Sequence, residues 1–498
     1  MKSTLHRVCI NGSLRASNLL WKRAYSTLEP LPTAHILTPE ELTPLSEKKI
    51  ELIQKPLADS VDTRTIVDND YGVTLNCIEE AHERIRFLLK PTPIQYSPLL
   101  SQDIFGKEAL PSKTNKSPRQ IFLKYENKHM TGSFKERGAI NKLALLSAEE
   151  RSRGVVASSA GNHAQAVSYH AMRMGVDCTI CMPETAPLSK INGTKRYGAK
   201  VVLVGNNLDD AYVEASRIMK EEGRTFVHPY NDFDVISGQG TLGLELMEQN
   251  PYLDTVICPV GGGGLIAGTA LAIKSINPRI KVIGVEAEAM QGMIASKQAK
   301  KPVVVPFQTT IADGIAVKNV GEKTFKIIDK YVDDIVTVND GEIAQAVLTL
   351  LEREKTMCEG AGATGIAAML TNKINFTASQ KRICVVLSGG NIDVGLLREI
   401  IDRGLVNDGR LARLRVVVPD VPGNLARVLT SLAEMRCNVR EVEHERAFRN
   451  VPVGKTATIV TLQTRGWDHI DQVYKELTNM KFEFSFEGMP EHKYGVKE

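Results

Sequence analysis

Short apolar runs alternate along most of the chain with longer segments whose apolar residues recur every three or four positions. The short runs predict buried strands, and the longer period predicts helices with one buried face. The clearest strand–helix pairs are 200–204 with 208–222, 281–285 with 290–298, and 335–338 with 340–353. Alternation at this spacing predicts a parallel α/β sheet with helices on both faces.

The pattern changes after Gly409. An alternating strand over 411–418 leads into an amphipathic helix over 426–435. The elements expected after it are strands at 438–444 and 456–463, a helix at 467–478 and a last strand near 482–486. This βαββαβ order suits a ferredoxin-like module, so we expect a smaller α+β domain at 411–488.

One lysine stands where a tight turn opens a helix. The strand-like run 121–126 is followed by a polar connection, 127–132, and helical character continues from Ala139. Lys135 therefore lies at a helix start, where the positive end of the helix dipole disfavours its protonated form. A neutral amine suits a lysine that forms an imine. By itself this context is more typical of a solvated surface lysine, and three further motifs change that interpretation.

The first of these motifs is the stretch 158–165, which contains Ser158, Ser159, Asn162 and His163. It lies between an apolar run and a helical pattern, so the N–H groups of the helix start can receive an anion such as a substrate carboxylate. The alternative is an ordinary βα turn that Asn162 caps.

The second and third motifs also follow strands. Four glycines, Gly261 to Gly264, join the run 255–260 to a helix expected at 266–276. Because glycine costs backbone entropy, so many at one junction indicate that the main chain approaches something closely, and a phosphate is the natural ligand. Ser388 follows the strand 382–386, at the strand end where α/β proteins bind ligands.

Together these motifs resemble the fold-type II pyridoxal phosphate (PLP) enzymes, and within them the threonine/serine dehydratases, from about Tyr71 to about Leu405. The resemblance implies a two-lobed α/β catalytic domain over 71–405, with open sheets like those of the tryptophan synthase β subunit, and Lys135 as the Schiff-base lysine. The residues that would bind the cofactor phosphate are Gly261, Gly262, Gly263, Gly264 and Leu265. Asn162 would meet the cofactor 3′-oxygen, and Ser388 would hydrogen-bond the pyridine nitrogen. The substrate would be held by Ser158, Ser159, Asn162 and His163.

A hydroxyl opposite the pyridine nitrogen also bears on the reaction. It does not force that nitrogen to stay protonated, so the ring is a weaker electron sink, which suits β-elimination better than transamination. We therefore expect a threonine ammonia-lyase that converts L-threonine, and L-serine, to 2-oxobutanoate or pyruvate with release of ammonia. A non-catalytic amino-acid sensor is the alternative from another class.

Serine racemases are close relatives and the nearest alternative. They carry a serine as the acid/base on the far face of the cofactor, where this chain has Ala160. Inversion should therefore be poor. Glu286 matches one ligand of the racemase metal site, but Gly292 stands where a carboxylate is expected, so we predict no required divalent metal.

The C-terminal module resembles an ACT domain, an amino-acid-sensing module. The turn Pro422, Gly423, Asn424 and Leu425 carries this resemblance, which implies that the turn binds an effector at a domain–domain interface. The alternative is a dimerisation module without a ligand. Only one copy is present, whereas isoleucine-inhibited biosynthetic enzymes often carry two, and this puts feedback control by isoleucine in doubt. A role in isoleucine biosynthesis is expected, with a catabolic role as the alternative.

Two motifs are set aside. The stretch 238–243 matches the GxGxxG pattern of dinucleotide-binding folds, but it follows a polar loop, 232–236, rather than a clear strand, and no acidic residue stands about twenty positions later. Cys178 and Cys181 are spaced like a redox or zinc pair. Because they lie inside the apolar run 176–182 and no second pair exists, we expect buried structural thiols.

Composition limits the partners and the compartment. Residues 1–28 carry five Lys and Arg and no acid, and removing these five charges from the net +4 leaves −1, which gives no case for nucleic-acid binding. This basic, serine-containing segment predicts a presequence for the mitochondrial matrix, the alternative being a basic tail on a cytoplasmic enzyme. Residues 29–70 are expected to form an extension. The eight scattered cysteines suggest a reducing compartment, and no apolar run approaches the ~20 residues that span a bilayer. We expect a homo-oligomer, a dimer or a tetramer.

Overall fold

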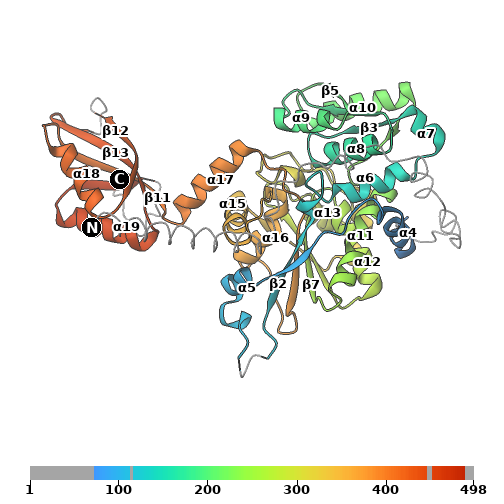
Figure 1. Ribbon diagram of the computed structural model, residues 1–498, viewed down its shortest axis with the longest axis horizontal. Helices are drawn as coiled ribbons and strands as arrows, with labels where there is room; N and C mark the ends of the chain where they lie inside the picture. Colours follow the sequence, from blue (N-terminus) through green and yellow to red (C-terminus); the bar gives the residue numbers. More distant parts are fainter. Residues whose placement is uncertain (1–71, 113–115, 446–450, 488–498) are drawn as a thin grey trace, which may run out of the picture.

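The computed structural model describes residues 72–112, 116–445 and 451–487. Two lobes with mostly parallel sheets form the main body, and a third, antiparallel sheet forms the C-terminal module (Figure 1). The segments predicted as presequence and extension, 1–28 and 29–70, lie outside the described residues.

The larger lobe is built on a six-stranded sheet. In spatial order its strands are β1 (Ile94–Ser97), β2 (Gln120–Tyr125), β10 (Arg382–Leu387), β7 (Thr255–Pro259), β8 (Lys281–Ala287) and β9 (Asp334–Val338). β1 is antiparallel to β2, and the other neighbours are parallel. Alternate residues serve two cores, since Ile383 and Val385 lie in one buried cluster and Cys384 and Val386 in another. Burial on both faces explains why these strands read as continuous apolar runs.

Helices cover both faces of this sheet. The helices of the larger lobe are α4 (Leu75–Ile85), α5 (Pro98–Phe105), α11 (Phe233–Gln249), α12 (Gly264–Ile276), α13 (Gly292–Ala299), α14 (Glu322–Tyr331), α15 (Asp340–Thr349), α16 (Gly360–Leu370) and α17 (Val394–Asn407). Short 3₁₀ turns are η2 (Gly106–Ala109), η3 (Glu126–Lys128) and η4 (Asp313–Ile315), and η5 (Leu350–Glu354) is a π-helical turn that follows α15. The predicted alternation of strand and helix is confirmed.

The smaller lobe has a four-stranded parallel sheet. Its strands, in spatial order, are β5 (Lys200–Leu203), β4 (Cys178–Met182), β3 (Val155–Ser158) and β6 (Thr225–Phe226). Its helices are α6 (Lys135–Ala144), α7 (Ala148–Arg153), α8 (Asn162–Arg173), α9 (Leu188–Arg196) and α10 (Leu208–Glu222). Cys178 and Cys181 are buried free thiols in β4, as expected.

The stretch 238–243 lies inside α11, which begins at Phe233. The expectation that 232–236 forms a polar loop before this stretch is therefore wrong. The Asp232 side chain accepts hydrogen bonds from the N–H groups of Asp234 and Val235 and so caps α11, which runs through all the glycines of the motif. These glycines permit close packing: a Cβ on Gly238 would lie 2.5 Å from the Arg137 carbonyl oxygen in α6. The motif therefore serves contact between helices, and its rejection as a dinucleotide site is consistent with its position inside a helix.

The C-terminal module has the predicted βαββαβ order. Its antiparallel sheet runs β12 (Asn438–Glu445), β13 (Lys455–Gln463), β11 (Leu411–Pro419), β14 (Glu483–Glu487), and its helices are α18 (Asn424–Glu434) and α19 (Trp467–Asn479). In Figure 1 the module lies beyond α17, away from the two lobes. Arg410 forms an ion pair of 2.5 Å with Glu352, and the Trp467 indole donates to the Asn407 carbonyl at 3.1 Å. Polar contacts of this kind tie the module to the larger lobe.

None of the described helices combines the length and the apolar character that crossing a membrane requires.

Candidate active site

Lys135 is the first residue of α6, at the junction of the two lobes. The chain reaches it from the carboxyl end of β2, and Phe134 N–H donates to the Ser388 carbonyl at 3.0 Å, which places the Lys135 turn beside the end of β10. The Lys135 ammonium donates to the Pro229 carbonyl at 2.7 Å. Burial lowers the pKa of Lys135 to about 8, against the opposing charge of Glu359. Burial is thus the main cause of the depressed pKa.

The glycine turn lies next to Lys135 through the segment 228–231. A Cβ on Gly262 would lie 2.4 Å from the Tyr230 ring, and a Cβ on Gly261 would lie 2.9 Å from the Ile315 Cα. Gly263 has a φ of +91°, which side chains rarely adopt. The backbone can therefore follow this path only with glycine, and the turn ends at the N-terminus of α12.

Backbone donors in this turn are available to a ligand. The Gly262 carbonyl accepts a hydrogen bond from the Thr324 hydroxyl at 2.7 Å, which fixes the orientation of the peptide. Among the described residues, no acceptor is paired with the N–H groups of Gly261, Gly262 or Gly263. Unpaired N–H groups at a helix N-terminus form a cradle for an anion such as a phosphate.

Asn162 is the first residue of α8 and faces the larger lobe. Its Nδ2 donates to Glu359 Oε1 at 2.7 Å, and its Oδ1 accepts from Asn391 Nδ2 at 2.8 Å. The sequence placed Asn162 in the site. Glu359 and Asn391 were not among the site residues predicted from the sequence.

The serine and histidine positions of the same turn lie beside Asn162. Ser159 Oγ accepts from Gly161 N–H at 3.2 Å, and Ser158 Oγ lies 3.5 Å from the Leu208 carbonyl oxygen. His163 Nε2 lies 2.8 Å from the Val227 carbonyl, and burial lowers the pKa of His163 to about 3, so the ring stays neutral. With its one N–H given to Val227, His163 offers a substrate carboxylate no donor in this tautomer. Its predicted substrate role stays a prediction without support from this geometry.

Sequence reasoning missed the segment 228–231. The Pro229 carbonyl accepts a hydrogen bond from the Lys135 ammonium. His228 Nδ1 accepts hydrogen bonds from the N–H groups of Tyr230 and Asn231 at 3.2 and 2.8 Å. The segment has neither helical nor alternating period, and its only visible signal is a run of turn-forming and aromatic residues. Its importance follows from contacts over long sequence distances.

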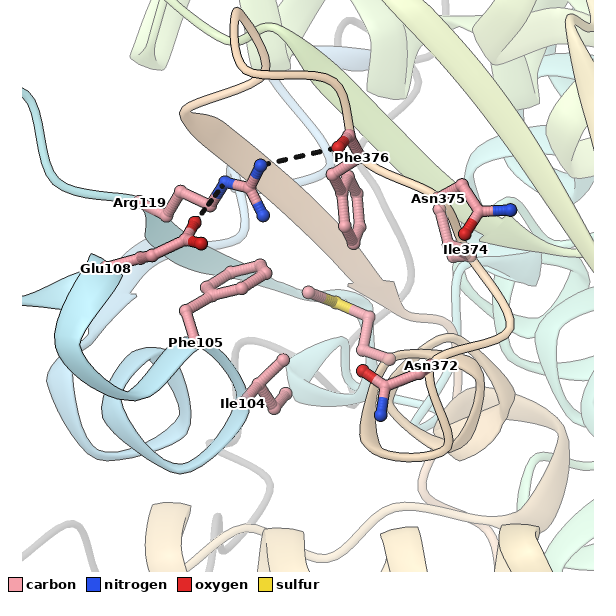
Figure 2. Close-up of a pocket in the computed structure, with 9 residues that line it drawn as sticks. Ile104, Phe105, Glu108, Arg119, Asn372, Ile374, Asn375 and Phe376 are labelled. Carbon is pink, nitrogen blue, oxygen red and sulfur yellow. Dashed lines mark hydrogen bonds and ion pairs between the residues drawn. The ribbon is translucent and has the colours of Figure 1, made fainter.

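A surface hollow of about 290 Å³ lies elsewhere, at the edge of the larger lobe. Figure 2 shows Arg119 beside Glu108 at its rim, and apolar side chains such as Phe105 and Phe376 on its walls. The Arg119–Glu108 ion pair measures 3.1 Å, and Arg119 also donates to the Phe376 carbonyl at 3.4 Å. None of the predicted site residues lines this hollow, and Arg119 and Glu108 at its rim already pair with each other. The hollow is therefore separate from the predicted site around Lys135.

Residues 85–389 match the family described as "Pyridoxal-phosphate dependent enzyme". The chain belongs to this family. It is 46% identical over 416 residues to a protein named L-threonine ammonia-lyase from Thermotoga maritima, a match that covers 84% of this chain and 100% of that one. PLP is therefore the cofactor of the family to which this chain belongs.

Two solved structures of the family extend the comparison. Serine racemase from Dictyostelium discoideum is 36% identical, with a TM-score of 0.59 over 65% of this chain and 99% of that one. The processed form of threonine deaminase isoform 2 from Solanum lycopersicum is 30% identical, with a TM-score of 0.59 over 76% of this chain and 99% of that one. The two-lobed fold that the sequence predicted is thereby confirmed.

The residues present fit PLP. The cofactor carries an aldehyde, which the Lys135 amine can bind, and a phosphate, which the unpaired N–H groups of the glycine turn can receive. Ser388 follows β10, beside the turn that carries Lys135, and Asn162 lies at the start of α8, so each could offer a polar side chain to the cofactor ring. The roles of single residues toward the cofactor remain predictions.

Glu286, the residue that matched a racemase metal ligand, lies at the end of β8 and binds the first turn of α13. Its two carboxylate oxygens accept the N–H groups of Met293 and Ile294 at 2.7 and 3.0 Å, and burial raises its pKa to about 7. Over the part of the chain that the structure describes, no cluster of three His, Cys, Asp or Glu could hold a metal. The independence from a divalent metal stays a prediction.

Proposed function

We propose that this protein is a PLP-dependent ammonia-lyase that converts L-threonine to 2-oxobutanoate and ammonia, and L-serine to pyruvate and ammonia. The observation that carries the proposal is the 46% identity over the whole length of a protein named L-threonine ammonia-lyase. The site supports it, because Lys135, Ser388 and the glycine turn follow the carboxyl ends of the neighbouring strands β2, β10 and β7.

Each site residue has a task in this proposal. Bound PLP supplies the electron sink that stabilises negative charge at the substrate Cα. The Lys135 amine, whose pKa burial lowers to about 8, removes the Cα proton as general base. The N–H groups of the glycine turn hold the phosphate, Ser388 contacts the pyridine nitrogen, and Asn162 donates to the 3′-oxygen. Ser158 and Ser159 hold the substrate carboxylate.

Elimination is favoured over racemisation by Ala160. This residue stands between Ser159 and Gly161 on the turn before α8, and its methyl group packs against the core of the smaller lobe. A methyl group carries no proton, so a planar substrate carbanion cannot be reprotonated from that position. Serine recovered from the reaction should remain the L enantiomer, and chiral chromatography of the residual serine measures this directly.

The deciding experiment is release of 2-oxo acid from L-threonine by the purified, PLP-loaded protein. We expect 2-oxobutanoate and ammonia in equal amounts, and no turnover in Lys135→Ala, whose bound PLP should also lose the visible absorbance of the lysine-linked cofactor. Lys142→Ala is a matched control, because Lys142 lies in the same helix and pairs with Asp232 and Asp234 instead. A Lys135→Ala protein with normal turnover would sink the assignment.

We further propose that the C-terminal module binds an amino-acid effector at Pro422, Gly423, Asn424 and Leu425. Gly423 has a φ of +97° and precedes α18, and Asn424 Nδ2 donates to the Pro419 carbonyl at 3.0 Å, so the turn has a defined shape. Calorimetric titration of the full chain with apolar amino acids tests this. If none of these amino acids binds, the alternative, a dimerisation module without a ligand, is favoured.

Localisation and assembly are proposed on the sequence alone. We propose the mitochondrial matrix as the compartment and a dimer or tetramer as the assembly. Import of the full chain into isolated mitochondria with removal of residues 1–28, and light scattering of the purified protein, test the two statements.

A further inference from the structure

Glu359 is a buried carboxyl group at the boundary between the two lobes. It stands just before the first residue of α16 in the larger lobe, is 4% exposed, and accepts a hydrogen bond at 2.7 Å from Asn162 at the start of α8 in the smaller lobe. Burying a carboxyl group is costly unless it is well hydrogen-bonded, so its retention at this place calls for an explanation.

The surrounding backbone leaves room for this one contact. A Cβ on Gly389 would lie 2.4 Å from Glu359 Oε1 and 3.0 Å from Asn162 Nδ2, and a Cβ on Gly314 would lie 3.2 Å from Glu359 Oε1. Glycine at both positions thus makes the space that the carboxyl group occupies. Glu359 N–H also donates to the Gly389 carbonyl at 3.0 Å, which fixes the two segments to each other.

The hydrogen bonds of Asn162 then determine what its amide can offer a ligand. An Asn side chain has one acceptor oxygen and two N–H donors. Asn391 occupies the oxygen and Glu359 occupies one N–H, so a single N–H remains, with its direction set by the other two bonds. We propose that Glu359 is a positioning residue that orients Asn162 so that this remaining N–H meets the cofactor. The inference deepens the proposed function and rests on it for the contact between Asn162 and PLP.

The carboxyl group of Glu359 changes its charge near neutral pH. Burial and the nearby charge of Asp313 raise the pKa of Glu359 to about 7, while Asn162, Lys190 and the Asn391 backbone N–H oppose the shift. Lys135 and Cys358 also feel its charge. Lys190 of α9 forms an ion pair with Asp313 of η4, so the charges that act on Glu359 come from both lobes.

The experiment compares PLP affinity, measured by titration of the apoprotein and followed by absorbance, in Glu359→Ala, Asn162→Ala and the double variant. Loss of the acceptor in Glu359→Ala should weaken PLP binding on the order of tenfold, as expected for one hydrogen bond to a charged group. If Glu359 acts through Asn162, the double variant should bind PLP no more weakly than Asn162→Ala alone. Glu286→Ala is the matched control, since it removes another buried carboxyl whose pKa burial raises to about 7, and it should leave PLP affinity unchanged.

Glu359→Gln separates the acceptor from the charge. It keeps an oxygen that can accept from Asn162, so PLP affinity should stay near that of the parent protein, while any step in the bound-PLP absorbance between about pH 6 and 8 should disappear. Wild-type affinity in Glu359→Ala or in Asn162→Ala, or full additivity of the two losses, would overturn the proposal. Failure of the PLP-loaded parent protein to release 2-oxobutanoate would instead count against the proposed function and leave this comparison intact.

Discussion

The amine of Lys135 lies in surroundings that disfavour its charge, and this has a consequence for cofactor loading. Because burial lowers the pKa of Lys135 to about 8, the neutral, nucleophilic form grows as the pH rises through about 8 and is nearly complete one unit above it. We predict that the rate of covalent PLP incorporation into the apoprotein rises about tenfold per pH unit below pH 8 and levels off near pH 9. Stopped-flow absorbance at fixed PLP concentration measures it. A rate that keeps climbing with the same slope up to about pH 10 would show that Lys135 titrates like a solvated lysine.

The start of α6 was predicted from the sequence, whereas the start of α8 was not. Lys135 was placed at a helix start, where α6 begins, but the helical pattern after the stretch 158–165 was expected from residue 166, and α8 begins at Asn162. The first turns of both helices contain polar residues whose burial depends on distant partners. Arg137 is buried and forms ion pairs with Glu126, at 2.7 Å, and with Glu245, at 2.8 Å. Apolar periodicity cannot reveal such pairs. By contrast, the C-terminal βαββαβ order depends on local alternation, and each of its elements lies within two residues of the prediction at either end.

The same limit applied to the site. Lys135, Asn162, the glycine turn and Ser388 were identified because each follows a strand in a short motif. Pro229 and Glu359 were not assigned roles, because their contacts cross 94 and 197 residues of chain. A single sequence carries no signal for a contact of that length.

At the scale of elements, the packing of α6 against α11 should be sensitive to one methyl group. A Cβ on Gly238 would lie 2.5 Å from the Arg137 carbonyl oxygen and 2.7 Å from the Gly138 Cα, both backbone atoms that cannot move aside cheaply. We predict that Gly238→Ala lowers the free energy of unfolding by about 1–3 kcal/mol and, because α6 carries Lys135, also weakens PLP binding. Urea denaturation and PLP titration measure the two effects.

Gly341→Ala is the control for this substitution. Gly341 is exposed in the first turn of α15, and its Cβ would meet only the Asn339 side-chain oxygen, at 3.3 Å. Alanine there should be neutral or stabilising by up to about 1 kcal/mol. Equal stability of the two alanine variants would contradict the argument that close helix approach requires Gly238.

The segment 352–359 lies between the C-terminal module and the candidate active site. Glu352 in η5 pairs with Arg410 at the start of the module, Glu354 accepts from Ser97 at 2.6 Å, and the segment ends at Glu359 beside Asn162. η5 is a π-helical turn, a rare form of helix that often occurs at functional sites. If an effector binds the module, its binding can reach the residues around Lys135 by a short path, through the Arg410–Glu352 ion pair and the segment 352–359.

The Arg410–Glu352 ion pair is exposed, so its loss should change stability by less than about 1 kcal/mol and leave basal turnover unchanged. If the module acts on the site through this segment, Arg410→Glu and Glu352→Arg should each reduce the change in turnover that a bound amino acid produces, and the double charge swap should restore it, because only the swap re-forms the pair. Turnover of L-threonine with and without the amino acid identified by calorimetry is the measurement. An undiminished response in both single variants would place the coupling in other contacts of the junction, such as that between Trp467 and Asn407.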